Sequence, residues 1–447
     1  MKKYSILFVN LCLVLALGSC SSDDYTRALP SGSTALMYVE GSKSVAEALQ
    51  KQLPVDGIGD MGLDFSQKIY FFELADGNAG MCVRVGDAGL VEKTLAKLAE
   101  NDFCKEVSEV GGLQTAVLNK SWVAAYDDNA FLVMFSVQPT EINPTKSRLV
   151  RFLKQNGECS EKFARLFEKL HSMKTPAAIV GRGQTLLKTS NLDLPQGVEP
   201  SQVLEAVGIT VEKGVVYAKS NRFSFDEKTE NALKNYERIL RPIQGNYAWN
   251  FSSEMLFCVA MNVDGNQFLP MIQNEELLKP LLASSNAVID MNNIIKSING
   301  DVALMFSTDF LSSEGQFSII AELSHSQWLA DVGYWKTSIP KGGEIKDWGK
   351  NAYCYTDGKT PFYFGVAETS SSPKQHFFCG NTSEVAQSPL QPANRPVSPD
   401  VVETLKGSHF AVVMNMKKNS GIAGMAMMQM LQPFLGETNT FVYLIES

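Results

Sequence analysis

The chain has 447 residues, of which 45% are hydrophobic and 20% charged, and its formal net charge is −8. This length and apolar content predict a globular protein with two or more domains. The acidic balance provides no basic surface, so we expect no nucleic-acid partner.

The first residues have the three-part pattern of an export signal. Two lysines precede an apolar run from Ser5 to Gly18, and Leu17-Gly18-Ser19-Cys20 places small residues before a cysteine. The run of about 14 residues is shorter than the roughly 20 that a membrane-spanning helix needs. We predict a signal peptide at residues 1–19 and lipidation of Cys20. The alternatives are an ordinary secretory signal and a buried helix, in both of which Cys20 would have no special role.

The Leu-Gly-Ser-Cys spacing resembles a lipobox, which implies acylation of both the thiol and the amino group of Cys20. Two or more acyl chains hold a protein stably on a membrane. Ser21-Ser22-Asp23-Asp24 resembles the surface-export tag of lipoproteins from Bacteroidetes-type bacteria, and the alternative is a solvated tether. We expect a lipidated tether at residues 20–33 and attachment to the outer membrane through the lipid, and exposure at the cell surface stays open.

The first half of the chain, residues 34–246, is predicted to be an α+β module. Apolar runs predict strands at Thr34–Val39, Lys68–Leu74, Met81–Val85, Gln114–Leu118, Trp122–Tyr126, Ala130–Ser136 and Ala177–Val180. Helical spacing predicts helices after Asp87 and around Phe163–Leu170. A hairpin of Ile209–Glu212 and Val215–Ala218 follows, and then an amphipathic helix around Leu233.

The second half, residues 247–447, is predicted to repeat this order. Strands are expected at Leu256–Asn262, Val302–Ser307, Gln316–Leu323, Asn351–Tyr355, Phe362–Val366, His376–Cys379 and His409–Met414. The final strand, Phe441–Ile445, either leaves an edge open to another chain or pairs within the protein's own sheet.

An internal repeat connects the two halves. The offset in sequence from Ile69 to Val302 equals the offset from Pro176 to His409. Hairpins and meanders make antiparallel sheet, with helices on its faces. The sequence therefore predicts an α+β fold of two tandem, diverged copies of a module with a mainly antiparallel sheet covered by helices.

A family resemblance rests on the lipobox, the acidic tether, the segment Leu29-Pro30-Ser31-Gly32-Ser33-Thr34 and the doubled layout that begins with a strand. The chain resembles a family of uncharacterised outer-membrane lipoproteins from Bacteroidetes-type bacteria. That family has no assigned activity, so the resemblance implies no functional residue except Cys20.

Six cysteines follow Cys20, and none forms a C-x-x-C pair that would indicate a zinc or redox motif. Most lie in apolar runs, where a free cysteine behaves as a small buried hydrophobe. Cys354 and Cys379 fall in neighbouring predicted strands and are the pair to check for a disulfide, whose state the sequence leaves open.

No pattern in the sequence points to catalysis. Gly57-Ile-Gly59-Asp-Met-Gly62 has the letters of a dinucleotide fingerprint, but a helix precedes it and a strand follows, which reverses the required order. The four histidines lack metal-binding spacing, and no G-x-S-x-G elbow occurs. We therefore predict no catalytic, metal-binding or cofactor-binding residues, and no cofactor.

Two features could bind a partner. Tyr334, Trp335 and Trp348 flank a segment rich in glycine and lysine, and exposed aromatic rings suit a glycan or a protein partner. The alternative is that the rings pack against the sheet. A methionine-rich helix, Gly421–Leu435, could be an adaptable docking face or part of the core.

These observations favour a membrane-anchored binding or interaction module with an unknown ligand. One alternative is an unrecognised hydrolase that acts on glycan or peptidoglycan, because glycosidase carboxylates come from distant positions in a sequence. A second alternative is a structural subunit of an envelope assembly that uses the final strand.

Overall fold

The computed structural model describes residues 24–50, 61–155, 159–182, 194, 198–274, 278–307, 315–358, 361–369, 372–416 and 438–446. Cys20 and the predicted helix Gly421–Leu435 lie outside these residues. Two compact units are present, and the division between them falls along one strand, β9 (Leu204–Glu212). The predicted boundary between residues 246 and 247 rests on the internal repeat in the sequence and not on compactness. It stays a prediction.

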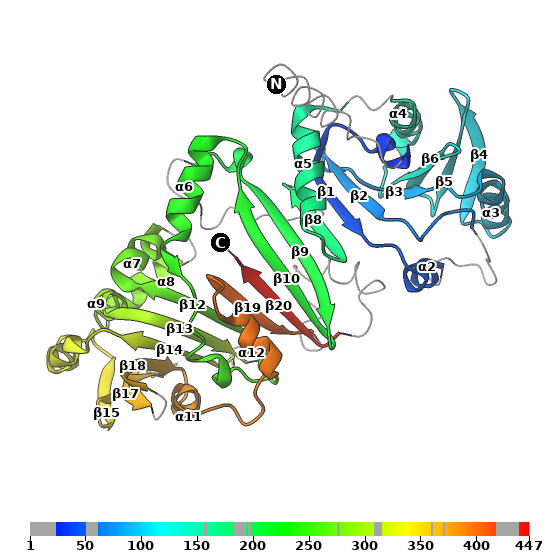
Figure 1. The fold of residues 1–447 in the computed structure, drawn as a ribbon. Helices are drawn as coiled ribbons and strands as arrows, with labels where there is room; N and C mark the ends of the chain where they lie inside the picture. Colours follow the sequence, from blue (N-terminus) through cyan, green and yellow to red (C-terminus); the bar gives the residue numbers. More distant parts are fainter. Residues whose placement is uncertain are drawn as a thin grey trace, which may run out of the picture. The chain divides into compact units, whose positions relative to one another are not determined.

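The sheet of the first unit is antiparallel (Figure 1). At its centre β1 (Ser33–Val39) lies between β2 (Ile69–Leu74) and β8 (Ala177–Gly181), and Leu204–Ile209 of β9 pairs with β8. Beyond β2 the order is β3 (Ala79–Arg84), β7 (Ala130–Met134), β6 (Trp122–Tyr126), β5 (Leu113–Leu118) and β4 (Cys104–Val110). The strands β1, β2, β7 and β8 are almost wholly buried, because their residues are apolar without alternation.

Helices cover this sheet. The helix α2 (Lys43–Gln50) follows β1, α3 (Ala88–Glu100) packs beside β4, α4 (Ile142–Lys154) lies on β6 and β7, and α5 (Glu161–Ser172) lies on β1 and β8. The side chain of Asp87 accepts a hydrogen bond from the N–H of Leu90 and so caps α3. Val91, Leu95 and Leu98 of this helix are buried on its inner face, as their spacing predicts.

Residues 24–30 fall within the predicted tether and are folded onto the first unit. They begin with a short helix, Asp24–Ala28, in which Tyr25 and Ala28 are buried together with the following Leu29. The hydroxyl of Tyr25 donates to the carbonyl of Lys68 at 2.9 Å. Apolar side chains therefore fix the chain to the unit from Tyr25 onward.

The second unit has a mixed sheet. Its central strand β12 (Phe257–Asp264) lies between β13 (Ile298–Phe306) and β19 (Phe410–Asn415), and β11 (Leu240–Arg241) continues the β19 side. Beyond β13 come β14 (Phe317–Leu323), β18 (Ser372–Gly380), β17 (Phe362–Thr369), β16 (Ala352–Thr356) and β15 (Glu344–Gly349). Beyond β19 come β20 (Thr440–Ile445) and, parallel to it, β10 (Val215–Phe223).

Both faces of this second sheet carry a hydrophobic core. Ala303 and Ile320 face a cluster that includes Val401 and Leu405 of α12 (Pro399–Leu405), while their neighbours Val302 and Ala321 face a second cluster around Trp328. The other helices are α6 (Glu227–Glu237), α7 (Gly265–Asn274), α8 (Leu278–Asn286), α9 (Met291–Lys296), α10 (Val332–Ser338) and α11 (Ser383–Gln387). Mixed sheet and helices together give the α+β fold that the sequence predicts.

The predicted final strand has neighbours on both sides. Its Val442 lies opposite Val413 of β19 and opposite Tyr217 of β10, and it is fully buried. The protein's own sheet therefore satisfies this strand, as in the second of the two alternatives. Among the described residues, no helix is long and apolar enough to cross a membrane.

Candidate functional site

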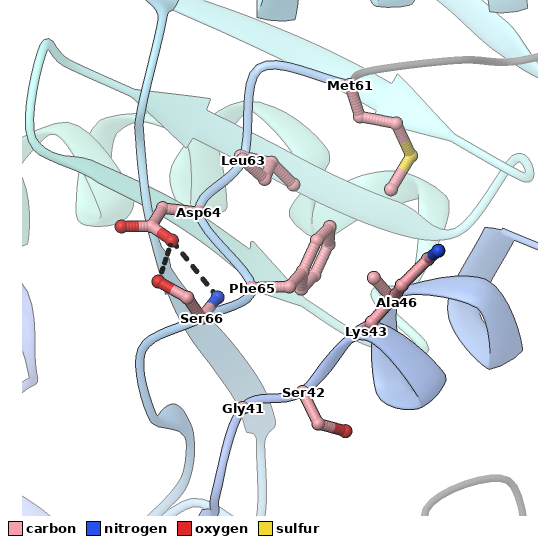
Figure 2. Close-up of a pocket in the computed structure, with 9 residues that line it drawn as sticks. All are labelled: Gly41, Ser42, Lys43, Ala46, Met61, Leu63, Asp64, Phe65 and Ser66. Atoms are coloured by element: carbon pink, nitrogen blue, oxygen red, sulfur yellow. Dashed lines mark hydrogen bonds between the residues drawn. The ribbon is translucent and has the colours of Figure 1, made fainter.

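A pocket of about 410 Å³ opens in the first unit between two short segments of chain (Figure 2). One segment is the end of the β1–α2 connection with the start of α2, and it contributes Gly41, Ser42, Lys43 and Ala46. The other segment precedes β2 and contributes Met61, Leu63, Asp64, Phe65 and Ser66. Figure 2 shows the ring of Phe65 and the side chain of Met61 pointing towards Ala46 on α2. The volume lies in the range of small-molecule sites, which is roughly 300–1,000 Å³.

Backbone contacts hold the segment Met61–Ser66 against β3. Leu63 forms a β-bridge with Val85, and the N–H of Asp64 donates to the carbonyl of Arg84 at 2.9 Å. Gly62 has φ +76°, and a Cβ there would lie 2.3 Å from the carbonyl oxygen of Asp87. Only glycine fits this position, because any side chain would meet both backbone strain and backbone atoms.

The opposite side of the pocket depends on a second close approach of backbone. A Cβ on Gly41 would lie 2.1 Å from the carbonyl oxygen of Gln67, so the two segments touch at this residue. Immediately after it, the hydroxyl of Ser42 accepts a hydrogen bond from the N–H of Val45 at 3.2 Å. This bond satisfies one of the free N–H groups at the start of α2.

The walls of the pocket combine apolar and polar groups. Met61, Leu63 and Phe65 supply the apolar surface. Lys43, whose side chain is 91% exposed, also lines the pocket and forms an ion pair with Glu47 at 3.9 Å. The carboxylate of Asp64 accepts hydrogen bonds from the N–H and the hydroxyl of Ser66, at 3.0 and 2.5 Å. Asp64 also pairs with Arg84 at 3.8 Å, so its charge is already engaged and the pocket favours an apolar or amphipathic ligand.

The three aromatic residues singled out in the sequence occupy different environments. Tyr334 is 72% exposed on α10, whereas its neighbour Trp335 is 5% exposed and stacks on Trp328 with ring centroids 6.0 Å apart. Trp348 on β15 is half-buried and packs edge-on against Tyr363 at 5.0 Å. The three rings form no common surface, and a binding role stays a prediction for which only Tyr334 offers a solvent-facing ring.

Trp249 is a large exposed hydrophobic residue that the sequence reasoning missed. It is 48% exposed in the short helix Ala248–Asn250, and its carbonyl accepts a hydrogen bond from the N–H of Ala393. The side chain of Asn250 donates to the carbonyls of Pro389 and Gln391, at 2.8 and 2.7 Å. The proline-rich loop, residues 388–399, is therefore fastened next to Trp249, and no periodicity in the sequence indicates this contact.

Cys354 and Cys379 are both free thiols. Cys354 lies opposite Tyr363 and Cys379 lies opposite Phe364, so β17 separates the two cysteines. Because consecutive residues of a strand point to opposite faces, the two thiols also lie on opposite faces of the sheet. Strands about 4.8 Å apart place the two α-carbons farther apart than a disulfide allows.

The second unit contains a buried cluster of charged groups that the sequence reasoning did not find. Asp301 on β13, Glu322 on β14 and His376 on β18 are each 1–2% exposed. Asp301 and Glu322 approach each other because β13 has a bulge between Ile298 and Val302, opposite Glu322. Burial lowers the pKa of His376, the carboxylate of Glu322 raises it, and Lys374 lowers it further.

This cluster is closed to substrates. The cavity beside Asp301 and Tyr247 has a volume of about 10 Å³, which is at most the space of one water molecule. The carboxylate of Asp301 is already bonded to the side chain of Asn262 at 2.8 Å and to two backbone N–H groups. Within the described part of the chain, no group of three or more His, Cys, Asp or Glu side chains is arranged to hold a metal ion.

Comparisons with known proteins give the family and little else. No curated protein sequence matches the chain. Among solved structures, crystal form IV of TP0453 is 10% identical, with a TM-score of 0.27 over 43% of this chain and 77% of that one. Crystal form III of TP0453 is 8% identical, with a TM-score of 0.22 over 83% of this chain and 98% of that one. A domain of unknown function, DUF4836, matches residues 39–435, and the chain belongs to that family.

Proposed function

We propose that the protein is a membrane-tethered module of the cell envelope that binds a small amphipathic ligand. The pocket between Gly41–Ala46 and Met61–Ser66 carries this proposal, because its volume and apolar lining suit such a ligand. The ligand's apolar part would lie on Met61, Leu63 and Phe65. Its polar or anionic end would face Lys43, whose largely exposed ammonium group also pairs with Glu47 at 3.9 Å.

A direct test is the binding of a dansyl-labelled medium-chain fatty acid to the purified protein, followed by fluorescence. We expect saturable binding that weakens at least tenfold in the Phe65→Ser variant, because the ring forms part of the apolar wall. Tyr334→Ser is the matched control, since it removes an exposed ring outside the pocket. Absence of binding, or equal affinity in both variants, would contradict the proposal.

The tether is part of the same proposal. We propose that residues 1–19 are removed, that Cys20 is lipidated, and that the protein belongs to the outer-membrane lipoproteins of Bacteroidetes-type bacteria. The support is the Leu-Gly-Ser-Cys spacing and the acidic residues Asp23 and Asp24. In cell fractionation, the wild type should sediment with membranes and Cys20→Ala should not. Protease treatment of intact cells then distinguishes an outward-facing from an inward-facing protein.

We also propose that the two units arose by duplication. Leu36 on β1 lies between Phe72 and Val180, and Val259 on β12 lies between Leu304 and Val412. The number of residues from Phe72 to Val180 equals the number from Leu304 to Val412. The neighbours beyond also agree in order, since β3 and β7 follow β2 as β14 and β18 follow β13.

Other members of the family can test this duplication. We expect the strand order around the two central strands to stay matched in them, even where loops differ in length, because a register shift of one residue would turn buried side chains to the opposite face. A relative with a different strand order in one unit would count against a shared origin of the units.

A further inference from the structure

A loop of the second unit, residues 244–251, is held to its sheet by side chains from three strands. Asp301 on β13 accepts the N–H groups of Gln244 and Asn246, at 3.0 and 2.9 Å. Glu322 on β14 accepts the side-chain amide of Asn246 at 2.7 Å. The hydroxyl of Tyr247 meets Nδ1 of His376 on β18 at 2.5 Å, inside the core.

The contact between Tyr247 and His376 depends on the protonation of the histidine. Nε2 of His376 lies 3.2 Å from the hydroxyl of Thr369, and Nδ1 faces Tyr247. In neutral His376 with its proton on Nε2, Nδ1 accepts the tyrosine proton and Nε2 donates to Thr369. Protonation makes Nδ1 a donor, so the buried Tyr247 hydroxyl loses the acceptor for its own proton.

The charged groups around the pair offset this conflict only in part, because Glu322 favours the charged histidine while burial and Lys374 oppose it. Glu322 lies opposite His376 in the strand register, but its oxygens already bind Asn246 and Nζ of Lys374, the latter at 2.9 Å. Lys374 adds a positive charge on the same strand as His376. Asp301 is occupied by the loop itself and by Asn262. The imidazolium would therefore be buried in a network whose acceptors are already engaged.

We infer that Tyr247 and His376 form an acid-sensitive latch, which holds the loop 244–251 on the sheet at neutral pH and releases it on acidification. The loop carries Trp249, and through Asn250 it fastens Pro389 and Gln391, so release would free both segments. The direction of this pH effect follows from the linkage between proton binding and release of the loop. The pKa of buried His376 lies below the ordinary value of 6.5, so the released form binds more protons and gains population as pH falls below 6.5.

Hydrogen–deuterium exchange of the full chain at several pH values tests the latch. After correction for the intrinsic rate, opening of residues 244–251 should increase about tenfold for each pH unit below 6.5, until the pH reaches the lowered pKa of His376. In His376→Asn the amide oxygen can still accept from Tyr247 but cannot titrate, so this increase should disappear. His325→Asn is the matched control, because His325 is exposed and outside the cluster.

Three outcomes would overturn the latch. One is an equal pH response in the wild type and His376→Asn. Another is a response in which β12 and β13 open together with the loop, because this would be unfolding of the whole unit. The third concerns Tyr247→Phe, which keeps the buried ring and removes the hydroxyl. At pH 7.5 its loop should open more readily than that of the wild type at the same pH, and a loop as closed as the wild-type loop would refute the role of the hydrogen bond.

Discussion

The carboxylate of Glu322 occupies the space that a side chain on Gly300 would need. A Cβ on Gly300 would lie 1.9 Å from Oε2 of Glu322, and the backbone φ of +151° is also unfavourable for other residues. The bulge in β13 that brings Asp301 towards Glu322 contains this glycine. The buried cluster therefore depends on the absence of a side chain at one position.

Gly300→Ala should destabilise the second unit by about 2–4 kcal/mol, because it combines backbone strain with displacement of a buried carboxylate. Denaturant unfolding measures this loss. Gly342→Ala is the control, since φ is +102° there but nothing lies within 4 Å of the added atom. An equal loss in the two variants would mean that the backbone alone accounts for the effect.

Two adjacent aromatic residues should respond very differently to truncation. Trp335→Ala should cost about 3–5 kcal/mol, because the ring is buried between Trp328 and Phe364. Tyr334→Ala should change the free energy of unfolding by less than about 0.5 kcal/mol, since its ring is exposed. Thermal or denaturant unfolding of both variants checks the difference, and similar losses would contradict the burial of Trp335 and the exposure of Tyr334.

The free cysteines should react in an order set by burial. Burial raises the pKa of Cys258 to about 12 and moves the pKa values of Cys82 and Cys379 upward as well. Cys159 and Cys354, which are half-buried, should therefore be modified first by a thiol reagent in the native protein. Peptide mapping after mild oxidation should show no Cys354–Cys379 disulfide, and finding that bond would contradict the register of β16, β17 and β18.

An ion pair in the first unit should lose its effect in acid. Burial raises the pKa of Asp76, but the hydrogen bonds from Arg148 and Asn78 outweigh it, so the pKa lies below 3.8. The pair between Asp76 and Arg148 spans 2.6 Å and joins the β2–β3 turn to α4. Because folding lowers the pKa of Asp76, the ion pair contributes its full stability at pH values above 3.8. This stability is lost as the pH falls through the lowered pKa of the folded protein.

Asp76→Asn should therefore reduce stability by less than about 1 kcal/mol at pH 7, because the pair is partly exposed. The difference from the wild type should shrink towards zero at pH 2. Melting curves of both proteins at pH 7 and pH 2 measure this difference in stability. A difference that grows in acid would contradict a lowered pKa of Asp76.

Strands with an apolar face were predictable, and strands without one were not. Apolar residues alone located β6 at Trp122–Tyr126 and placed β1, β13 and β20 to within a few residues. Within the described residues β4 pairs with β5 alone and β15 pairs with β16 alone, and neither β4 nor β15 was predicted. Their sequences, CKEVSEV and EIKDWG, alternate charges with few apolar residues, as edge strands do.

Contacts between residues that are distant in the sequence explain the other features that were not predicted. The proline-rich loop, residues 388–399, has no apolar periodicity in the sequence, but Asn250 and Phe251 bind it from far along the chain. Strand register and a bulge bring Asp301, Glu322 and His376 together, so no local spacing in the sequence indicates this cluster. The pocket likewise depends on two close backbone approaches, at Gly41 and Gly62, whose partners only the fold supplies.

The parallel pairing of β20 with β10 sets an order of events during folding. Asn221, at the end of the paired region, binds the carbonyl of Glu446, which lies 225 residues later in the chain. Contacts between such distant residues form slowly, because a long loop must close before they contribute stability. Until then β19 and β10 each present an unpaired edge, which is where a chaperone would engage the chain and where misassembly would begin. A chain shortened before Thr440 would therefore fail in the interior of its sheet.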